Sequence, residues 1–302
     1  SDREDSAVLD HLRSVGVRVF VGHDASHVDP TSVVVVSTAI REGNPELAIA
    51  RERGQLVIHR SQALALAASG MRFIGVAGAH GKTTTSGMLA IGLSACGLDP
   101  SVAVGGVLPQ LGTGAHLGGG DVFVAEADES DGSFLNYSPA IEIVTNVEPD
   151  HLDRYHSREE FEQIFIEFAP RMVPGGLLVT CAEDEGACRL ADAALAEGLR
   201  VVTYGRADRS LRDPDVVISD VRVEAHGAGA SVTWGPRSAS LALCVPGEHN
   251  VLNATAAWVA GIECGLEPQA TADGLGEFTG AARRFEARGQ VGTRRLFDDY
   301  AH

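Results

Sequence analysis

The sequence is almost without lysine: its 302 residues contain one, Lys82, and every other strongly basic side chain is arginine. Basic residues are also outnumbered, since 24 lysines and arginines stand against 41 aspartates and glutamates, and the formal net charge is −17. Nucleic acids and anionic membranes are bound by basic surfaces, so this balance argues against both as partners. The net charge does not exclude small anionic ligands, because these respond to local charges. The arginine bias is compositional, and it makes the one lysine more informative.

Cysteine and long apolar runs are scarce as well. The five cysteines include no C-x-x-C pair, so reduced thiols are a simpler interpretation than disulfides or a zinc site. No apolar run approaches the roughly 18 residues of a membrane span, and the first residues lack the pattern of a signal peptide. We therefore expect a cytoplasmic protein without membrane partners. No stretch of the sequence indicates an oligomeric state.

Valine-rich runs and glycine dominate what is present. Hydrophobic residues make up 44% of the chain and glycines number 35, which is enough for the cores of two domains. Short apolar runs at 17–22, 32–38 and 55–60 predict parallel strands. Between the last two, residues 44–54 carry Asn44 as a helix cap, a proline in the first turn and a glycine at the end. This alternation predicts βαβ units in a doubly wound, Rossmann-like arrangement.

A second domain is predicted after a change of composition near residues 68–71. Strands and helices alternate again, up to a stretch at 201–245 whose alternating pattern and Gly-rich turn favour antiparallel strands. The strands predicted before that stretch are 72–78, 121–128, 141–147 and 175–181, and the helices of this domain are 82–97, 157–170 and 250–265.

The predicted fold is therefore α/β. A truncated Rossmann-like N-terminal domain, 1–68, precedes a P-loop-type central domain, 69–295, with a mostly parallel sheet and a small antiparallel section. Residues 296–302 are predicted to begin a further domain, because FDDYAH stops just after a run typical of the start of an element. SDRED likewise begins without Met. We expect the sequence to be a fragment.

The stretch GVAGAHGKTTTSG, residues 75–87, joins a predicted strand to a predicted helix. Its glycines let backbone N–H groups approach an anion, the helix N terminus adds partial positive charge, and Lys82 can reach phosphates. The spacing departs from G-x-x-x-x-G-K-[ST], because Val76 stands where the first glycine is expected. A Gly-rich turn with a solvated lysine is the alternative, but three consecutive threonines are poor helix formers and disfavour a purely structural role. As a compact point charge, lysine also suits a narrow loop better than arginine does.

Acidic side chains follow two of the predicted strands. VFVAEADESDGSF places Glu126 at the end of an apolar run, with three further acidic residues behind it. Carboxylates at the carboxyl end of a parallel strand lie over the ligand crevice and suit Mg²⁺. Asp128 and Asp131 are also consistent with a solvated acidic loop. IVTNVEPDHLDRY repeats the arrangement with Asn146 and His151, and this histidine is consistent with a metal ligand, a phosphate contact or an ordinary loop residue.

Six segments occur in this order along the chain: GAHGKTTT, EADESDGSF, TNVEPDHLD, PGEHNVLNATAA, GAARRFE and DDYAH. Together they resemble the Mur ligase superfamily, over nearly the whole chain and with high specificity as a set. EADESDGSF resembles the branch that uses UDP-N-acetylmuramic acid and L-alanine. The murein tripeptide ligases, the nearest relatives of that branch, tend to differ just after EADE.

The resemblance implies an ATP- and Mg²⁺-dependent ligase that joins L-alanine to the lactyl carboxylate of UDP-N-acetylmuramic acid, a cytoplasmic step of peptidoglycan precursor synthesis. Phosphoryl transfer from ATP turns the unreactive carboxylate into an acyl phosphate, which the amine of alanine attacks. The catalyst mainly positions groups and neutralises charge. Three alternatives stay open: a murein tripeptide ligase, a folylpolyglutamate-synthase relative, and a nucleotide-binding module without catalysis.

The resemblance also implies roles for individual residues. The implied catalytic residues are Lys82, Glu126, His151 and Arg284, and the implied Mg²⁺ ligands are Thr83 or Thr84, Glu126 and His151. The implied ATP contacts are Gly78, Ala79, His80, Gly81, Lys82, Thr83, Thr84, His249, Asn250, Asn253, Arg284 and Asp299. The implied substrate contacts are Ser37, Asn146, Tyr300 and His302. The segment from His249 to Asn253 is alternatively the cap of the helix that follows it.

Two features depart from the family. Several members bridge their metal ions with a carbamoylated lysine, and this chain has no lysine left for that role once Lys82 is assigned to phosphate. The family's Gly-rich loop for the UDP part and its C-terminal domain over ATP have no counterpart among these 302 residues. From this segment alone we therefore expect weak nucleotide binding and negligible catalysis.

Overall fold

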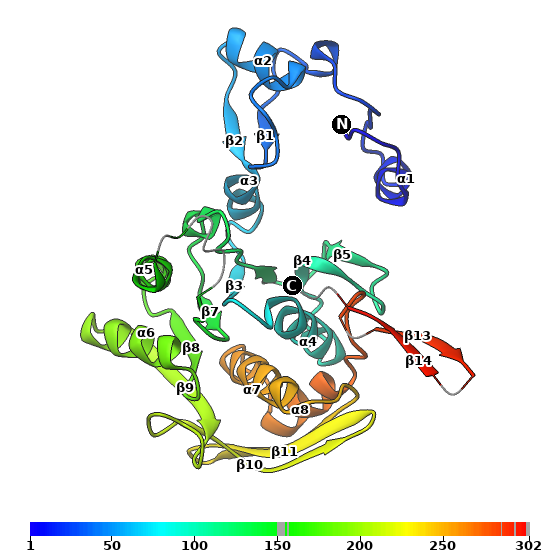
Figure 1. Ribbon diagram of the computed structural model, residues 1–302. Helices are drawn as coiled ribbons and strands as arrows, with labels where there is room; N and C mark the ends of the chain where they lie inside the picture. The colour runs from blue at the N-terminus through cyan, green and yellow to red at the C-terminus, as the bar shows by residue number, and fades with distance from the viewer. Residues whose placement is uncertain (150–154, 156, 285, 293, 300–302) are drawn as a thin grey trace. The chain divides into compact units, whose positions relative to one another are not determined.

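Figure 1 shows a computed structural model of the chain, which describes residues 1–149, 155, 157–284, 286–292 and 294–299. The chain divides into two compact units, Ser1–Ala67 and Ala68–His302. The predicted domain boundary after residue 68 lies one residue from this division. Helices and strands alternate in both units, so the predicted α/β class is confirmed.

The first unit is built around two parallel strands. β1 (Val34–Val36) and β2 (Val57–His59) pair in parallel, and α2 (Pro45–Glu52) connects them. The Asn44 side chain accepts hydrogen bonds from two backbone N–H groups in the first turn of α2, which confirms the predicted cap. The remaining helices of this unit are α1 (Ala7–Ser14), η1 (Ala25–His27) and α3 (Arg60–Ala67).

The strand predicted at 17–22 is wrong. Within the part of the chain that the structure describes, this segment makes one isolated bridge, between Val21 and Asp2, and joins no sheet. Val17 and Val21 are 47% and 50% exposed, so the run is apolar without being buried. An apolar run becomes a strand only where a neighbouring backbone pairs with its N–H and C=O groups.

One ten-stranded sheet organises the second unit, in the order β12-β11-β10-β9-β8-β7-β3-β6-β4-β5. The seven strands from β10 to β4 run parallel, and β12, β11 and β5 are antiparallel to their neighbours, as predicted for a mostly parallel sheet with a small antiparallel section. The strands are β3 (Arg72–Ala77), β4 (Ser101–Leu108), β5 (Thr113–His116), β6 (Val122–Glu126), β7 (Ile141–Val144), β8 (Leu177–Cys181), β9 (Arg200–Arg206), β10 (Val216–Glu224), β11 (Gly227–Trp234) and β12 (Arg237–Leu243).

Helices cover both faces of this sheet (Figure 1). On one face α4 (Lys82–Ala95), α7 (Glu248–Glu263) and α8 (Pro268–Gly276) pack on one another. On the other face lie α5 (Arg158–Phe168) and α6 (Glu185–Ala196). Because both faces are covered, β7 and β8 are buried at every residue, which explains why both are largely apolar. Two short helices, η2 (Ser133–Asn136) and η3 (Ala169–Arg171), adjoin α5.

Helix α8 also closes one edge of the sheet. The Gln269 side chain accepts a hydrogen bond from Ser240 N at 3.0 Å, and its Nε2 donates to Ser240 O at 3.1 Å. Gly276 approaches β12 so closely that a Cβ atom there would lie 2.5 Å from the Ala242 carbonyl oxygen. The edge strand is thereby joined to the helical layer through its own backbone.

The described part of the chain ends in an antiparallel hairpin of β13 (Glu286–Val291) and β14 (Arg294–Asp298). The sequence predicted a new domain from residue 296. That domain stays a prediction; residues 296–298 lie in β14 and pair with β13. Gly292, at φ +63°, supplies the left-handed backbone that the turn between the two strands requires.

Candidate active site

The predicted phosphate loop, residues 78–81, lies at the carboxyl end of β3. This strand pairs with β6 on one side and with β7 on the other. The chain passes from β3 to β4 and β6 on one side, and then reaches the other side with β7, so the direction of strand order reverses at β3. Ligands of doubly wound sheets bind at such a switch point.

Helix α4 begins directly after this loop. Its N-cap, Gly81, has φ +86° and offers no side-chain bond to the helix, and N–H groups in a first turn have no carbonyl one turn earlier. Both loop glycines are closely packed. A Cβ on Gly78 would lie 2.2 Å from Thr145 Oγ1, and one on Gly81 would lie 2.8 Å from Asn253 Oδ1. First-turn N–H groups that follow a tightly packed loop are the elements of an anion site.

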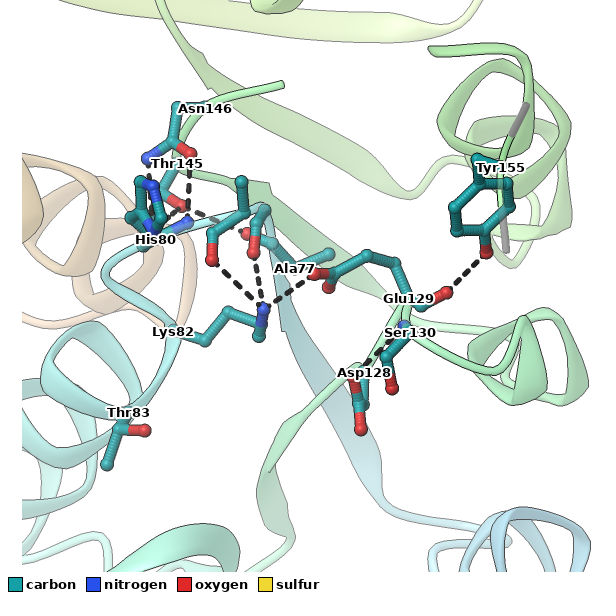
Figure 2. Close-up of polar contacts among 12 residues, drawn as sticks. Ala77, His80, Lys82, Thr83, Asp128, Glu129, Ser130, Thr145, Asn146 and Tyr155 are labelled. Carbon is teal, nitrogen blue, oxygen red and sulfur yellow. Dashed lines mark hydrogen bonds and ion pairs between the residues drawn. The ribbon is translucent and has the colours of Figure 1, made fainter. Parts of the chain in front are cut away.

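The Lys82 side chain folds back over this loop, as Figure 2 shows. Its Nζ donates to Gly78 O at 2.7 Å and to Glu129 Oε1 at 2.8 Å, with a longer contact to Ala79 O at 3.4 Å. An ammonium group has three donors, so these contacts use all of them. Lys82 is 16% exposed and Glu129 is fully buried. The one lysine of the chain therefore lies on the phosphate loop with a buried carboxylate beside it.

Glu129 is also held through its backbone. The Tyr155 hydroxyl donates to the Glu129 carbonyl oxygen at 2.5 Å, and Gly132 N donates to the same atom at 3.0 Å. The second carboxylate oxygen, Oε2, has no hydrogen-bond partner within the described residues. Burial raises the pKa of Glu129 above its ordinary value, and the Lys82 ammonium opposes that shift without cancelling it. Lys82 is thus the principal stabilising partner of this carboxylate.

Residues at the end of β7 fix the loop from the opposite side. The Asn146 amide accepts from His80 N at 2.9 Å and donates to His80 O at 3.0 Å. Thr145 Oγ1 donates to the same carbonyl at 2.5 Å, and Ala79 N donates to Asn146 O at 3.3 Å. Asn146 was predicted as a substrate contact, which stays a prediction. The contacts described here instead give it a role in holding the loop.

The predicted metal ligands Glu126 and Thr83 lie on neighbouring elements. Glu126 ends β6, and its buried Oε1 has no hydrogen-bond partner within the described residues. Thr83 is buried in the first turn of α4, and Nη2 of Arg284 lies 3.5 Å from its Oγ1. The structure thus brings Arg284, which is 201 positions away in sequence, to the phosphate-loop helix. No cluster of three or more His, Cys, Asp or Glu side chains suited to a metal ion occurs in the described ranges.

Asn250 and Asn253 lie in the first turns of α7 and are buried at 8% and 7% exposure. Asn253 Nδ2 donates to Asn250 Oδ1 at 3.3 Å, and the Asn250 amide donates to Pro246 O at 2.7 Å. Asn253 also packs on Gly81, so α7 contacts the phosphate loop directly. His249 is exposed beside them. Their assignment to adenine stays a prediction.

The roles predicted for the other site residues stay predictions. His151, Tyr300 and His302 lie outside the described residues. Asp299 is exposed just after β14, and Thr84 is half-buried in α4. Ser37 follows β1 in the first unit. The loop alternative gains support for Asp128 and Asp131, because each carboxylate accepts a backbone N–H two residues ahead.

Three contacts of this cluster were not predicted from the sequence: Lys82 with Glu129, Tyr155 with the Glu129 carbonyl, and Thr145 with His80. Glu129 stood in the sequence as one acidic residue among four. Its position three residues after Glu126, beyond the end of β6, carried no sign of burial. The only available signal was the pairing of a single lysine with a carboxylate-rich strand end.

Comparison with known families covers the segment that holds this cluster. A family model described as the Mur ligase middle domain matches residues 76–261, which include the phosphate loop, Glu126, Glu129 and the start of α7. The chain belongs to the Mur ligase family. A second model, described as Mur ligase family, catalytic domain, matches residues 1–72. The resemblance noted in the sequence is thus confirmed.

Individual Mur ligases match the whole chain. It is 50% identical over 306 residues to the UDP-N-acetylmuramate–L-alanine ligase of Kineococcus radiotolerans, and equally to that of Renibacterium salmoninarum. All of this chain is covered in both comparisons, and it spans 64% of the length of each relative.

Solved structures of Mur ligases share the fold. The UDP-N-acetylmuramate–alanine ligase of Thermotoga maritima superposes with a TM-score of 0.80 at 30% identity, over 99% of this chain and 67% of the other. The murein peptide ligase of Psychrobacter arcticus reaches 0.79 at 27% identity, over 97% and 65%. No helix in the described ranges is long and apolar enough to span a bilayer.

Proposed function

We propose that this Mur ligase is the ATP-dependent enzyme that joins L-alanine to the lactyl carboxylate of UDP-N-acetylmuramic acid. The observation that carries the proposal is the closed phosphate loop at the switch point of the sheet, with Lys82 folded over it. Identity of 50% to ligases of that name supports the choice of substrates. The reaction is a cytoplasmic step of peptidoglycan precursor synthesis.

A carboxylate is a poor electrophile because its charge is delocalised over two oxygens. In the proposed reaction a carboxylate oxygen bonds to the γ-phosphorus of ATP while the bond to ADP breaks. The amine nitrogen of alanine then bonds to the carbonyl carbon of the acyl phosphate. The carbon–oxygen bond to phosphate breaks, the amine loses a proton, and the amide remains. The protein's part is to align these groups and to balance the phosphate charge.

The residues for this task lie around the phosphate loop. The open first turn of α4 offers N–H groups to phosphate oxygens, and Lys82 adds a positive charge over them. Arg284 lies beside the first turn of the same helix, where we assign it to the γ-phosphate. Asn146 and Thr145 keep the loop in shape while the nucleotide binds.

The oxygen donors beside the loop fit a magnesium ion. Glu126 has a buried carboxylate oxygen without a partner in the described residues, and the Thr83 hydroxyl lies in the first turn of α4. Hard oxygen donors of this kind suit Mg²⁺, and a buried carboxylate oxygen left unpaired favours a cation. We therefore assign Glu126 and Thr83, with His151, as its ligands. Bound there, the ion would neutralise charge on the phosphate oxygens.

Phosphate release tests the proposal. With Mg²⁺-ATP and UDP-N-acetylmuramic acid, the full-length protein should release phosphate only when L-alanine is added. Release without dependence on alanine would contradict the proposal. The structural likeness to a murein peptide ligase makes that activity the second candidate. Release with L-alanyl-γ-D-glutamyl-meso-diaminopimelate in place of alanine would select it.

A further inference from the structure

Glu129 lies beside the phosphate loop, is fully buried, and takes no part in the proposed reaction steps. Its Oε1 accepts a hydrogen bond from Lys82 Nζ at 2.8 Å. The carboxylate comes from the loop after β6, whereas Lys82 begins α4, so the contact joins two elements that flank the crevice. Figure 2 shows both side chains pointing toward one another.

Burying this ion pair has a high energetic cost. A buried carboxylate and a largely buried ammonium each lose hydration, and their attraction offsets this loss only in part. If Glu129 were neutral and apolar, the charged Lys82 would face the loop without a counter-charge. A long lysine side chain relieves that cost by turning its ammonium group into solvent. Glu129 therefore makes the inward position of Lys82 the stable one.

The direction of the lysine follows from the same contacts. Two of its hydrogen-bond acceptors, Gly78 O and Ala79 O, belong to the loop that is to surround the phosphates. These are weak, neutral acceptors that phosphate oxygens can displace, because bonds between charged groups are the stronger ones. Glu129 lies outside the loop and can keep its bond while this exchange takes place.

We propose that Glu129 is a positioning residue that holds the Lys82 ammonium group over the phosphate loop before the nucleotide arrives. The inference rests on the proposed function, since it takes the phosphates of a nucleotide as the partner of Lys82. Tyr155 supports Glu129 in turn, because its hydroxyl bonds to the Glu129 carbonyl and fixes the backbone that carries the carboxylate.

The single lysine permits a direct test. When the 302-residue chain is made with ¹³C,¹⁵N-labelled lysine, it gives one lysine side-chain signal in an NMR spectrum, and that signal is Lys82. In Glu129→Gln, which keeps the size of the side chain and removes its charge, we expect the nucleotide-free signal to move toward that of a mobile, solvated lysine. The affinity for a non-hydrolysable Mg²⁺-ATP analogue should fall on the order of tenfold, the scale of one charged hydrogen bond.

The matched control is Glu162→Gln. Glu162 is also a shielded glutamate with arginine partners, but it lies on α5, away from the loop. The Glu162→Gln variant should leave the Lys82 signal and the affinity for the Mg²⁺-ATP analogue unchanged. Tyr155→Phe should move the signal in the same direction as Glu129→Gln, by a smaller amount, and it replaces Glu129→Gln if that variant does not fold.

Two results would overturn the inference: a Lys82 signal that is the same in the folded Glu129 or Tyr155 variants as in the wild type, or tighter binding of the analogue by Glu129→Gln. Failure of the proposed function has a different signature. It would appear as a wild-type Lys82 signal that does not respond to the Mg²⁺-ATP analogue, while the nucleotide-free spectra would still report whether Glu129 holds the lysine.

Discussion

Two fully buried glutamates lie in the second unit, one beside the carboxyl edge of the sheet and one in its interior. Glu129 bonds to Lys82, whereas neither carboxylate oxygen of Glu142 has a partner in the described residues. Burial raises the pKa of both groups, and for Glu142 it does so far above the ordinary value because no cation opposes it. Equal burial is therefore opposed at one carboxyl and not at the other. The Lys82 ammonium limits the rise in the pKa of Glu129, and no such cation limits the rise for Glu142.

The largest effect on activity and stability is expected where the ion pair of Lys82 and Glu129 is broken. Lys82→Ala should lower kcat by on the order of 10²-fold or more, because it removes a preorganised charge from the phosphates. It should also destabilise the fold by about 3 kcal/mol, since Glu129 then resembles Glu142 and stays buried without a partner. Phosphate release and urea unfolding measure the two effects.

Two further variants sharpen that result. Lys82→Arg keeps the positive charge but changes the shape of the group that carries it. We expect kcat to fall in this variant as well, because the planar guanidinium does not fit the narrow loop. Lys82→Met combined with Glu129→Leu should regain stability without regaining activity, since a buried ion pair can be replaced by apolar side chains at little cost. Normal turnover in Lys82→Ala would refute the role of the lysine.

Glu142→Gln is expected to act next in size, on stability alone. Because the folded-state pKa of Glu142 is raised, the folded protein keeps a proton that the unfolded chain releases above its ordinary value of 4.5. The free energy of unfolding therefore falls as pH rises from that value to the folded-state pKa, by up to about 1.4 kcal/mol per pH unit from this group. Glutamine does not titrate, so the variant should lose this slope and be the more stable protein at neutral pH.

Urea unfolding between pH 4 and pH 8 measures that slope. Glu162→Gln is the matched control, because Glu162 contributes a pH dependence of stability with the opposite sign. Its two arginine partners, Arg189 foremost, lower the pKa of Glu162, so its small contribution to stability is present above the ordinary glutamate pKa and lost as the pH falls. If Glu142→Gln kept the full wild-type pH dependence, Glu142 would not be the source of that dependence.

A smaller effect is expected from Asn146→Ala, which removes two of the bonds that hold the loop at His80. The affinity for ATP should fall by about tenfold, because the loop must then be ordered by the ligand itself. Asn44→Ala is the control, since it removes a helix cap in the first unit and should cost about 1 kcal/mol of stability without changing ATP affinity. Equal ATP affinity in Asn146→Ala and the wild type would show that β7 does not hold the loop.

Sequence reasoning worked where one local property decides the outcome. Short apolar runs located β1, β2, β3, β6, β7 and β8. It failed where the outcome depends on a distant partner. β4 carries two adjacent glycines and β5 is a short run without an apolar pattern. β4 pairs with β6, and β5 pairs in turn with β4. The valine run at 17–22 has a clear apolar pattern, but within the described residues it pairs with no strand of a sheet.

The same limit applies to the site. Lys82 and Glu126 could be predicted because each belongs to a motif that is contiguous in sequence. The pairing of Lys82 with Glu129 spans 47 positions, and only packing distinguishes Glu129 from the acidic residues around it. The unpaired state of Glu142 is likewise a property of its surroundings, since the sequence shows only a charged residue inside an apolar strand.

The contact of Gln269 with the edge strand has a consequence for the protein in a crowded solution. An exposed edge offers rows of N–H and C=O groups on which a strand of another molecule can add, and aggregation often begins there. In β12 the side chain of Gln269 occupies both groups of Ser240, the midpoint of the strand. A foreign strand would have to displace that amide before it could extend the sheet. One glutamine on α8 thus protects the long sheet from growing sideways into an assembly.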